Sequence, residues 1–269
     1  TYYCVGLFAY AESADLLNIT LRNVDVTGYL DVGGLIGYAN NCNIINCSVE
    51  SGSVTGIDDN IGGLAGKIEN STIMNSSAGC SVRGVQHVGG LIGVLESDNN
   101  IINCYATGDV TGTGYLEKEG LTGWYTGGLV GLAQGQGESI IQRSFATGNV
   151  TGVSGVGGLV GQVHTIIDCY AVGNVTGSGE RIGGLAGQNG GPIENCFSAG
   201  FVNNTGTVRG GMIGFYNSTY DIISSYYDKD TAEMTDEDKG APRTTAEMMH
   251  QETFVGWDFD DIWDIDEGE

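Results

Sequence analysis

The chain has 269 residues, and its 33 Asp and Glu against ten Lys and Arg give a formal net charge of −23. A protein this acidic repels nucleic acids and anionic membrane surfaces, so we expect no nucleic-acid partner. No stretch reaches the about 18 to 20 apolar residues of a membrane span, so we expect none in this chain.

A glycine-rich phrase, "GGLVG" or a close variant, recurs along the chain from its first residues onward. The glycine before the recurrent leucine lies at Gly6, Gly34, Gly63, Gly90, Gly128, Gly158, Gly184 and Gly211. The intervals are 28, 29, 27, 38, 30, 26 and 27 residues. A period in this range is typical of a solenoid, a propeller or another array, here with about eight units.

Aligning the units gives columns of apolar or small residues that face a shared interior. One column follows the marker glycine and contains Leu7, Leu35, Leu64, Leu91, Leu129, Leu159, Leu185 and Met212. A second contains Ile44, Ile73, Ile101, Ile141, Ile166, Ile193 and Ile222, and three residues later stand Cys47, Ser76, Cys104, Ser144, Cys169, Cys196 and Ser225. Short apolar segments separated by Gly, Asn and Thr-Gly indicate strands and turns, and helical spacing is absent from the array.

The length of the period distinguishes a β-propeller from a β-solenoid. A propeller blade needs about 40 to 45 residues, whereas these units suit one coil of a parallel β-helix. We therefore predict an all-β, right-handed parallel β-solenoid of about eight rungs over residues 1–225, with a small C-terminal cap over 226–269. The odd spacing between the Ile and Cys/Ser columns requires a bend, which we place at Asn46, Asn75, Asn103 and Asn195, where amides can form a ladder.

At the N-terminus the array opens within a repeat, at "TYYCVGLFAY". The first rung then presents unpaired strand edges, which are a template for another chain. We expect residues 1–28 to pack against upstream sequence of a longer protein or against a neighbouring subunit.

The 38-residue interval contains an insertion, "TGTGYLEKEGLTGWYTGG". Insertions in repeat proteins often form the binding face, so Tyr115, Trp124 and Tyr125 are candidate ligand-binding residues that could stack on a sugar ring or a partner side chain. The alternative is that this loop folds onto the solenoid wall and shields its own rings.

After Ser225 the period ends, and Thr244 and Glu247 have capping-box spacing for a short helix. Trp257 and Trp263 follow among aspartates, so we predict that the tail covers the open end of the solenoid with its aromatic rings. The acidic run beginning at Asp228 lacks the glycine of a calcium-binding EF-hand, and we interpret it as solvated charge.

No motif predicts catalysis, a metal site or a cofactor. The three histidines, His87, His164 and His250, are scattered and have no positioned nucleophile. Cysteines alternate with serines in one column, which indicates small core residues with free thiols rather than zinc ligands or disulfides.

The cores "GGLVG" and "GGLIG", followed by "NCYATGDVTG", resemble the GLUG-motif repeats of large secreted and cell-surface proteins of bacteria and archaea, including stalk regions of some IgA-cleaving proteases. The segment "RTTAEMMHQETFVGWDFDDIWDIDEG" resembles the one that often follows such arrays. This resemblance implies a non-enzymatic extracellular or cell-surface scaffold, acting as a stalk, an adhesive surface or an assembly subunit, with glycans or host proteins as candidate ligands. The alternative is a carbohydrate-binding or polysaccharide-acting β-helix.

Overall fold

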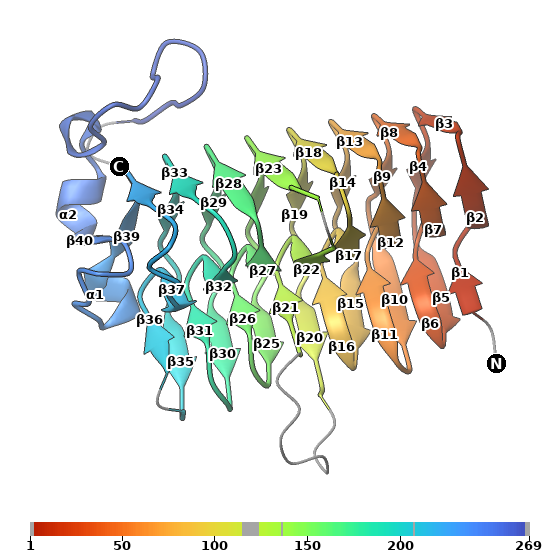
Figure 1. Ribbon diagram of the computed structural model, residues 1–269, viewed down its shortest axis with the longest axis horizontal. Helices are drawn as coiled ribbons and strands as arrows, with labels where there is room; N and C mark the ends of the chain where they lie inside the picture. Colours follow the sequence, from red (N-terminus) through yellow and green to blue (C-terminus); the bar gives the residue numbers. More distant parts are fainter. Residues whose placement is uncertain (1–2, 115–123, 136, 207, 267–269) are drawn as a thin grey trace.

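The chain folds as an all-β parallel solenoid, as the sequence predicts. The computed structural model describes residues 3–114, 124–135, 137–206 and 208–266. The backbone winds around one axis, from the N-terminal coil at one end to a cap at the other (Figure 1). Each complete coil contributes one short strand to each of five parallel sheets that run along the axis.

Two of the sheets flank the recurrent Gly-Leu step. The first contains β1 (Tyr3–Val5), β6 (Leu30–Gly33), β11 (Asp59–Gly62), β16 (Gln86–Gly89), β21 (Thr126–Gly127), β26 (Val156–Gly157), β31 (Ile182–Gly183) and β36 (Arg209–Gly210). The second contains β2 (Phe8–Glu12), β7 (Ile36–Asn40), β12 (Ala65–Glu69), β17 (Ile92–Glu96), β22 (Val130–Gln134), β27 (Val160–Val163), β32 (Ala186–Asn189) and β37 (Ile213–Phe215).

The other three sheets complete each coil. The third contains β3 (Asp15–Leu17), β8 (Asn43–Ile45), β13 (Thr72–Met74), β18 (Asn100–Ile102), β23 (Ile140–Gln142), β28 (Thr165–Ile167), β33 (Ile193–Glu194) and β38 (Ile222–Ile223). The fourth contains β4 (Thr20–Leu21), β9 (Ser48–Val49), β14 (Ser77–Ala78), β19 (Tyr105–Ala106), β24 (Phe145–Ala146), β29 (Tyr170–Ala171), β34 (Phe197–Ser198), β39 (Tyr226–Asp228) and β40 (Ala241–Arg243). The fifth contains β5 (Val24–Gly28), β10 (Gly52–Gly56), β15 (Ser81–Gly84), β20 (Val110–Gly112), β25 (Val150–Gly152), β30 (Val175–Gly177) and β35 (Val202–Asn204).

Equivalent residues of successive units lie opposite one another, so the sequence columns become side-chain stacks. Ile73, for example, pairs with Ile44 on one side and with Ile101 on the other. From the second coil to the seventh, the Leu and Ile columns are buried in one continuous core. Each coil therefore buries its apolar face against its two neighbours.

The marker glycines are required because the backbones of adjacent coils touch there. A Cβ atom on Gly128 would lie 2.0 Å from the carbonyl oxygen of Gly158, and one on Gly90 would lie 2.0 Å from that of Gly128. Real Cβ contacts are never this short, so a side chain at these positions would force the coils apart. The recurrence of glycine follows from this close approach.

The predicted bend between the Ile and Cys/Ser columns is present, and its corner residues are left-handed. Asn46, Asn75 and Asn103 have φ of 55°, 51° and 54°, a conformation that Asn tolerates better than most residues. The Asn46 amide donates to Asn18 (3.1 Å), and the Asn103 amide donates to Asn75 (3.1 Å). The expected amide ladder is therefore confirmed at these coils.

The Cys/Ser column does more than fill space, which the sequence did not indicate. The Cys104 thiol donates to the carbonyl of Ile102 (3.3 Å), and the Ser144 hydroxyl donates in the same way to Gln142 (2.8 Å). The Ser144 hydroxyl also accepts from the backbone N–H of Cys104 (3.0 Å). A small donor side chain is needed here because each corner leaves a buried carbonyl to satisfy.

The N-terminal end of the core is open. Leu7 occupies the same column as Leu35, yet the two residues are 57% and 1% exposed. Strands β1 to β5 are each the edge of their sheet. The first coil therefore presents both apolar side chains and unpaired backbone groups at this end.

The C-terminal end of the core is covered by residues 227–240. The Tyr227 ring is fully buried over Gly211, where an added Cβ would lie 2.1 Å from the ring, and Ala232 is buried beside it. The Lys239 ammonium donates to the carbonyl oxygens of Arg209 (2.8 Å) and Gly214 (3.3 Å) at the ends of two sheets. These contacts satisfy edge groups that a further coil would otherwise pair.

Two short helices, α1 (Lys229–Ala232) and α2 (Thr245–Met248), and one 3₁₀ turn, η1 (Gln251–Thr253), form the rest of the cap. The predicted capping box of Thr244 and Glu247 is present at α2. Asp228 was wrongly interpreted as solvated charge: it is buried, caps α1 and accepts from the hydroxyl of Thr245 (2.8 Å). This carboxylate joins the two helices because buried backbone and hydroxyl donors surround it.

The tail aromatic rings lie beside the solenoid rather than over its open end, which corrects the sequence-based prediction. Phe254 and Trp257 pack against Tyr226 and Phe197, which point outward from β39 and β34. The Trp257 indole donates to the carbonyl of Ser224 (2.8 Å). The tail is drawn to this face because the last coils expose an aromatic column there.

We predict that Gly128→Ala lowers the free energy of unfolding by about 3 kcal/mol or more, because the new methyl group would meet backbone rather than a flexible side chain. Urea unfolding followed by circular dichroism measures this change. Thr151→Ala, at an exposed position of β25, is the control and should stay within about 0.5 kcal/mol. Equal stability of the two variants would contradict the close-contact explanation.

We predict that Trp257→Ala destabilises the protein by about 3 to 5 kcal/mol, the usual cost of removing a buried tryptophan. Trp257 is 9% exposed, whereas Val255 in the same segment is 70% exposed, so Val255→Ala serves as the control. Urea unfolding and amide exchange at β39 and β40 measure the effect. Unchanged exchange in Trp257→Ala would show that the tail does not hold the last strands.

Candidate functional site

Of the three insertion residues proposed from the sequence, two lie in the described part of the chain. Tyr115 lies outside the described residues. Trp124 and Tyr125 are half-buried, and the Trp124 ring flanks Gly114 of the preceding coil. The ligand-binding role of these residues stays a prediction.

Tyr125 belongs to a polar column along one corner of the solenoid. Its ring stacks on His87 with centroids 6.4 Å apart, and its hydroxyl accepts from the Arg181 guanidinium (3.4 Å). His87 contacts the Asn60 amide (3.1 Å), which in turn donates to Asp31 (2.7 Å). Tyr125 is thus one member of a side-chain ladder, which accounts for its half-buried position.

The carboxylate of Asp59, beside this column, has a raised pKa. Burial raises the pKa of Asp59 to about 6, and the neighbouring charge of Asp58 adds to the effect. Burial also raises the pKa of Asp31, while the amide of Asn60 opposes that shift. These carboxylates are destabilised as anions because the packed corner replaces water around them.

A second column, on the outer face of the fourth sheet, is aromatic. Tyr105, Phe145, Tyr170 and Phe197 stack with centroids 4.8 to 5.0 Å apart and ring planes within 6° of parallel. We call these four residues the aromatic ladder. The sequence carries a signal for this ladder, since each ring directly follows a residue of the Cys/Ser column.

The tail covers only part of the aromatic ladder. The Trp263 ring packs against Tyr170 and Phe197, with centroids 6.1 and 5.9 Å apart and planes inclined by 51° and 53°. Tyr105, at the other end of the ladder, is 41% exposed. An aromatic surface therefore continues past the edge of the tail.

A cavity of about 700 Å³ lies where the tail meets the aromatic ladder. We call it the lateral pocket; its lining includes Phe145, Tyr170, Trp263, Arg143, Asp168 and Asp264. Its size falls within the range of small-molecule sites, and it combines aromatic walls with charged side chains. This combination makes it a candidate binding site.

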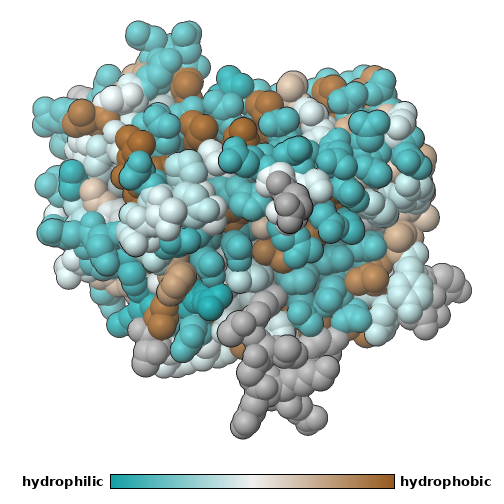
Figure 2. All heavy atoms as spheres, viewed as in Figure 1, coloured by the Kyte–Doolittle hydropathy of each residue, from teal (hydrophilic) through white to brown (hydrophobic). Residues whose placement is uncertain are grey.

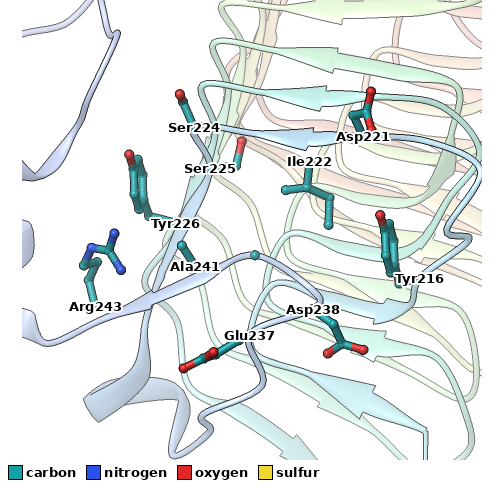
Figure 3. A pocket seen from close by; sticks show the side chains of 11 residues that line it. Tyr216, Asp221, Ile222, Ser224, Ser225, Tyr226, Glu237, Asp238, Ala241 and Arg243 are labelled. Carbon is teal, nitrogen blue, oxygen red and sulfur yellow. The ribbon is translucent and has the colours of Figure 1, made fainter.

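A smaller cavity of about 440 Å³, the end pocket, lies beside the last strand of the third sheet. Figure 3 shows Ile222 near its centre, with Tyr216 on one side and Tyr226 and Arg243 on the other. Its carboxylates do not converge, since Glu237 and Asp238 point away from each other (Figure 3). The Arg243 guanidinium lies over the Tyr226 ring, 5.0 Å from its centroid. This arrangement anchors the cap and assembles no reactive pair.

The surface in Figure 2 is mostly hydrophilic, with hydrophobic side chains in small separate groups. Within the described parts of the chain, His, Cys, Asp and Glu form no group of three or more that could hold a metal ion. The seven cysteines are free, and six of them are buried. Burial raises the pKa of the Cys104 thiol to about 12, so this thiol is a poor nucleophile.

Comparison with known proteins identifies the repeat. The family model described as the GLUG motif matches residues 28–55, 84–111 and 122–151. The chain carries GLUG-motif repeats. Each matched GLUG segment spans about one coil and includes strands of the fifth sheet at one or both of its ends.

Three relatives with similar sequence are much longer than this chain. A protein of Evansella cellulosilytica described as a Gly-rich membrane protein is 39% identical over 38% of this chain and 13% of that protein. Halomucin of Haloquadratum walsbyi is 37% identical over 54% of this chain and 2% of that protein. An immunoglobulin A1 protease of Streptococcus sanguinis is 31% identical over 58% of this chain and 8% of that protein. This chain therefore spans a small part of each relative.

A solved structure shares the fold of the GLUG array. A crystal structure of a Bacteroides ovatus protein, described as an immunoglobulin A1 protease, superposes with a TM-score of 0.57 at 19% identity. The match covers 91% of this chain and 70% of the other. In the described part of our chain, no helix is both long enough and apolar enough to span a membrane.

We predict that Asp59→Asn stabilises the protein above pH 6 and has no such effect below pH 3.8. The native state retains the Asp59 proton up to about pH 6, whereas the ordinary pKa is 3.8, so the stability of the wild type falls as pH rises between these values. Asn carries no charge, so the variant does not lose stability as the pH rises through this range. Urea unfolding at the two pH extremes measures the difference.

Thr55→Ala, a neighbouring change without a titrating group, is the control for this pH effect and should shift the stability equally at both pH extremes. If Asp59→Asn stabilised the protein equally above pH 6 and below pH 3.8, the charge explanation would be contradicted.

Proposed function

We propose that the chain is a non-enzymatic segment of an extracellular or cell-surface protein, acting as a β-solenoid stalk, adhesive surface or assembly subunit. The observation that carries this proposal is the asymmetry of the two ends. The N-terminal coil exposes Leu7 and five strand edges, whereas Tyr227 and Lys239 close the C-terminal end. A further parallel coil would pair with these N-terminal strand edges, whereas the C-terminal end is already covered.

The comparisons support a location at the cell surface or outside the cell. One relative bears the name of a membrane protein, and the chain matches only a small part of each of the three relatives. The net charge of −23 favours a body that stays soluble. Six of the seven cysteines are buried, which makes their thiols poor nucleophiles.

The occupant that best fits the N-terminal end is a further coil of the same GLUG type. Only a parallel five-stranded coil matches all five edges at once, and a leucine in its marker column would cover Leu7. The C-terminal end of a second copy fits poorly, because Tyr227 and the segment that follows it already fill that end.

The test is a fusion in which a copy of residues 29–56, one complete coil, precedes residue 1. We expect slower amide exchange in β1 to β5 and a higher melting temperature, because the first coil gains a paired neighbour. The control fusion carries Asp at the positions of Leu35 and Ile44 in the added coil. Equal protection by the two fusions, or by neither, would overturn the proposed stacking.

The second candidate function, carbohydrate binding or action on polysaccharides, is favoured by the lateral pocket with its aromatic and carboxylate lining. Incubation with plant, bacterial and host polysaccharides, followed by a reducing-end assay, separates the two activities. We expect no sugar release, and sugar release would support the enzymatic alternative.

A further inference from the structure

The lateral pocket lies where the corner ladder changes its chemistry. Six coils place Asn or Ser at this left-handed corner, whereas two adjacent coils place Arg143 and Asp168 there, with φ of 49° and 53°. Both residues line the lateral pocket. At these two coils, two charged side chains beside the cavity therefore replace the regular amide ladder.

Arg143 is not needed by the fold. Asn serves the same corner at Asn103 in the preceding coil and at Asn195 two coils further on, and the left-handed conformation suits Asn better than Arg. Among the residues that the structure describes, the guanidinium of Arg143 makes no ion pair, although Asp168 and Asp264 line the same cavity. The side chain is thus available to a ligand.

The pocket offers hydrogen-bond donors and acceptors together. Arg143 supplies donors, while Asp168, Asp261 and Asp264 supply carboxylate acceptors. The indole N–H of Trp263 is buried without an acceptor among the described residues. A ligand oxygen that reached this N–H would satisfy it.

The apolar part of the pocket is formed by aromatic rings at different inclinations. Phe145 and Tyr170 belong to the aromatic ladder, and Trp263 is inclined to Tyr170 by 51°. Phe145 and Phe197 cover the two faces of Tyr170, so Tyr170 presents its edge to the pocket. A ligand ring with apolar C–H groups and polar groups around its rim would fit this pocket.

We propose that the lateral pocket binds a neutral pyranose oligosaccharide. Each sugar hydroxyl both donates and accepts, which matches the mixture of guanidinium and carboxylates, and the C–H groups of the sugar ring pack against Trp263 and the edge of Tyr170. An anionic sugar would meet three carboxylates, and a simple cation would meet Arg143. This binding is independent of coil stacking, so either proposal can fail while the other stands.

Isothermal titration of the full chain tests the site, with cellohexaose, maltohexaose and laminarihexaose as neutral probes. We expect saturable binding of at least one probe. Arg143→Asn should weaken it about tenfold, because charged hydrogen bonds to the hydroxyls are lost. The same variant should melt no lower than the wild type, since Asn suits this corner.

Arg83→Thr is the matched control. It removes one positive charge from the fifth sheet and restores the residue found at Thr55 and Thr111 in the neighbouring coils. We expect its affinity to stay within about twofold of the wild type, and Asp264→Asn to weaken binding. These variants separate loss of the pocket from loss of net charge.

Four results would overturn the proposal. They are the absence of heat with all three neutral probes, equal affinity of wild type and Arg143→Asn, equal losses in Arg143→Asn and Arg83→Thr, or tighter binding of oligogalacturonate or hexalysine than of any neutral probe. The last result would assign the pocket to an acidic glycan or a basic peptide.

Discussion

The close approach of successive backbones at the marker glycines is the constraint on which the rest of this structure depends. With a carbonyl oxygen 2.0 Å from where a Cβ would lie, as at Gly128, only glycine allows the coils to stack at strand-pairing distance. Once the coils stack, equivalent residues of successive units lie opposite one another in all five sheets. The side-chain columns, the corner ladders and the aromatic ladder are consequences of that register.

Repetition also explains how specialised features coexist with a uniform core. Because each coil contacts mainly its neighbours, outward positions can change without disturbing the buried columns. Tyr105 stands in the column that Ser77 occupies one coil earlier, and Arg143 stands where Asn103 does. The lateral pocket arises from such replacements in adjacent coils together with the tail. Its chemistry is therefore carried by positions that the fold leaves free.

The features that repeat could be predicted from the sequence, and those that do not repeat largely could not. The solenoid, the Leu and Ile columns, the bend at Asn46 and the capping box at Thr244 each follow from spacing. The burial of Asp228 could not be foreseen, because it depends on contacts between α1 and α2. The place of the tail also escaped prediction, since Trp257 and Trp263 pack on an outward column whose stacking appears only after the coils are aligned in space. The lateral pocket could not be predicted either, because it is formed by the tail and by the outward aromatic column together.

The hydrogen bonds that join the coils run along the axis, and the described chain enters at one end and leaves at the other (Figure 1). A pulling force on the two ends would therefore peel the solenoid rather than shear it. The last coil is held by Lys239 and Tyr227, so coils further from the cap should separate before it. Each released coil of about 28 residues frees roughly 95 Å of extended chain. A surface stalk built this way would lengthen in steps under load while its remaining coils stayed folded.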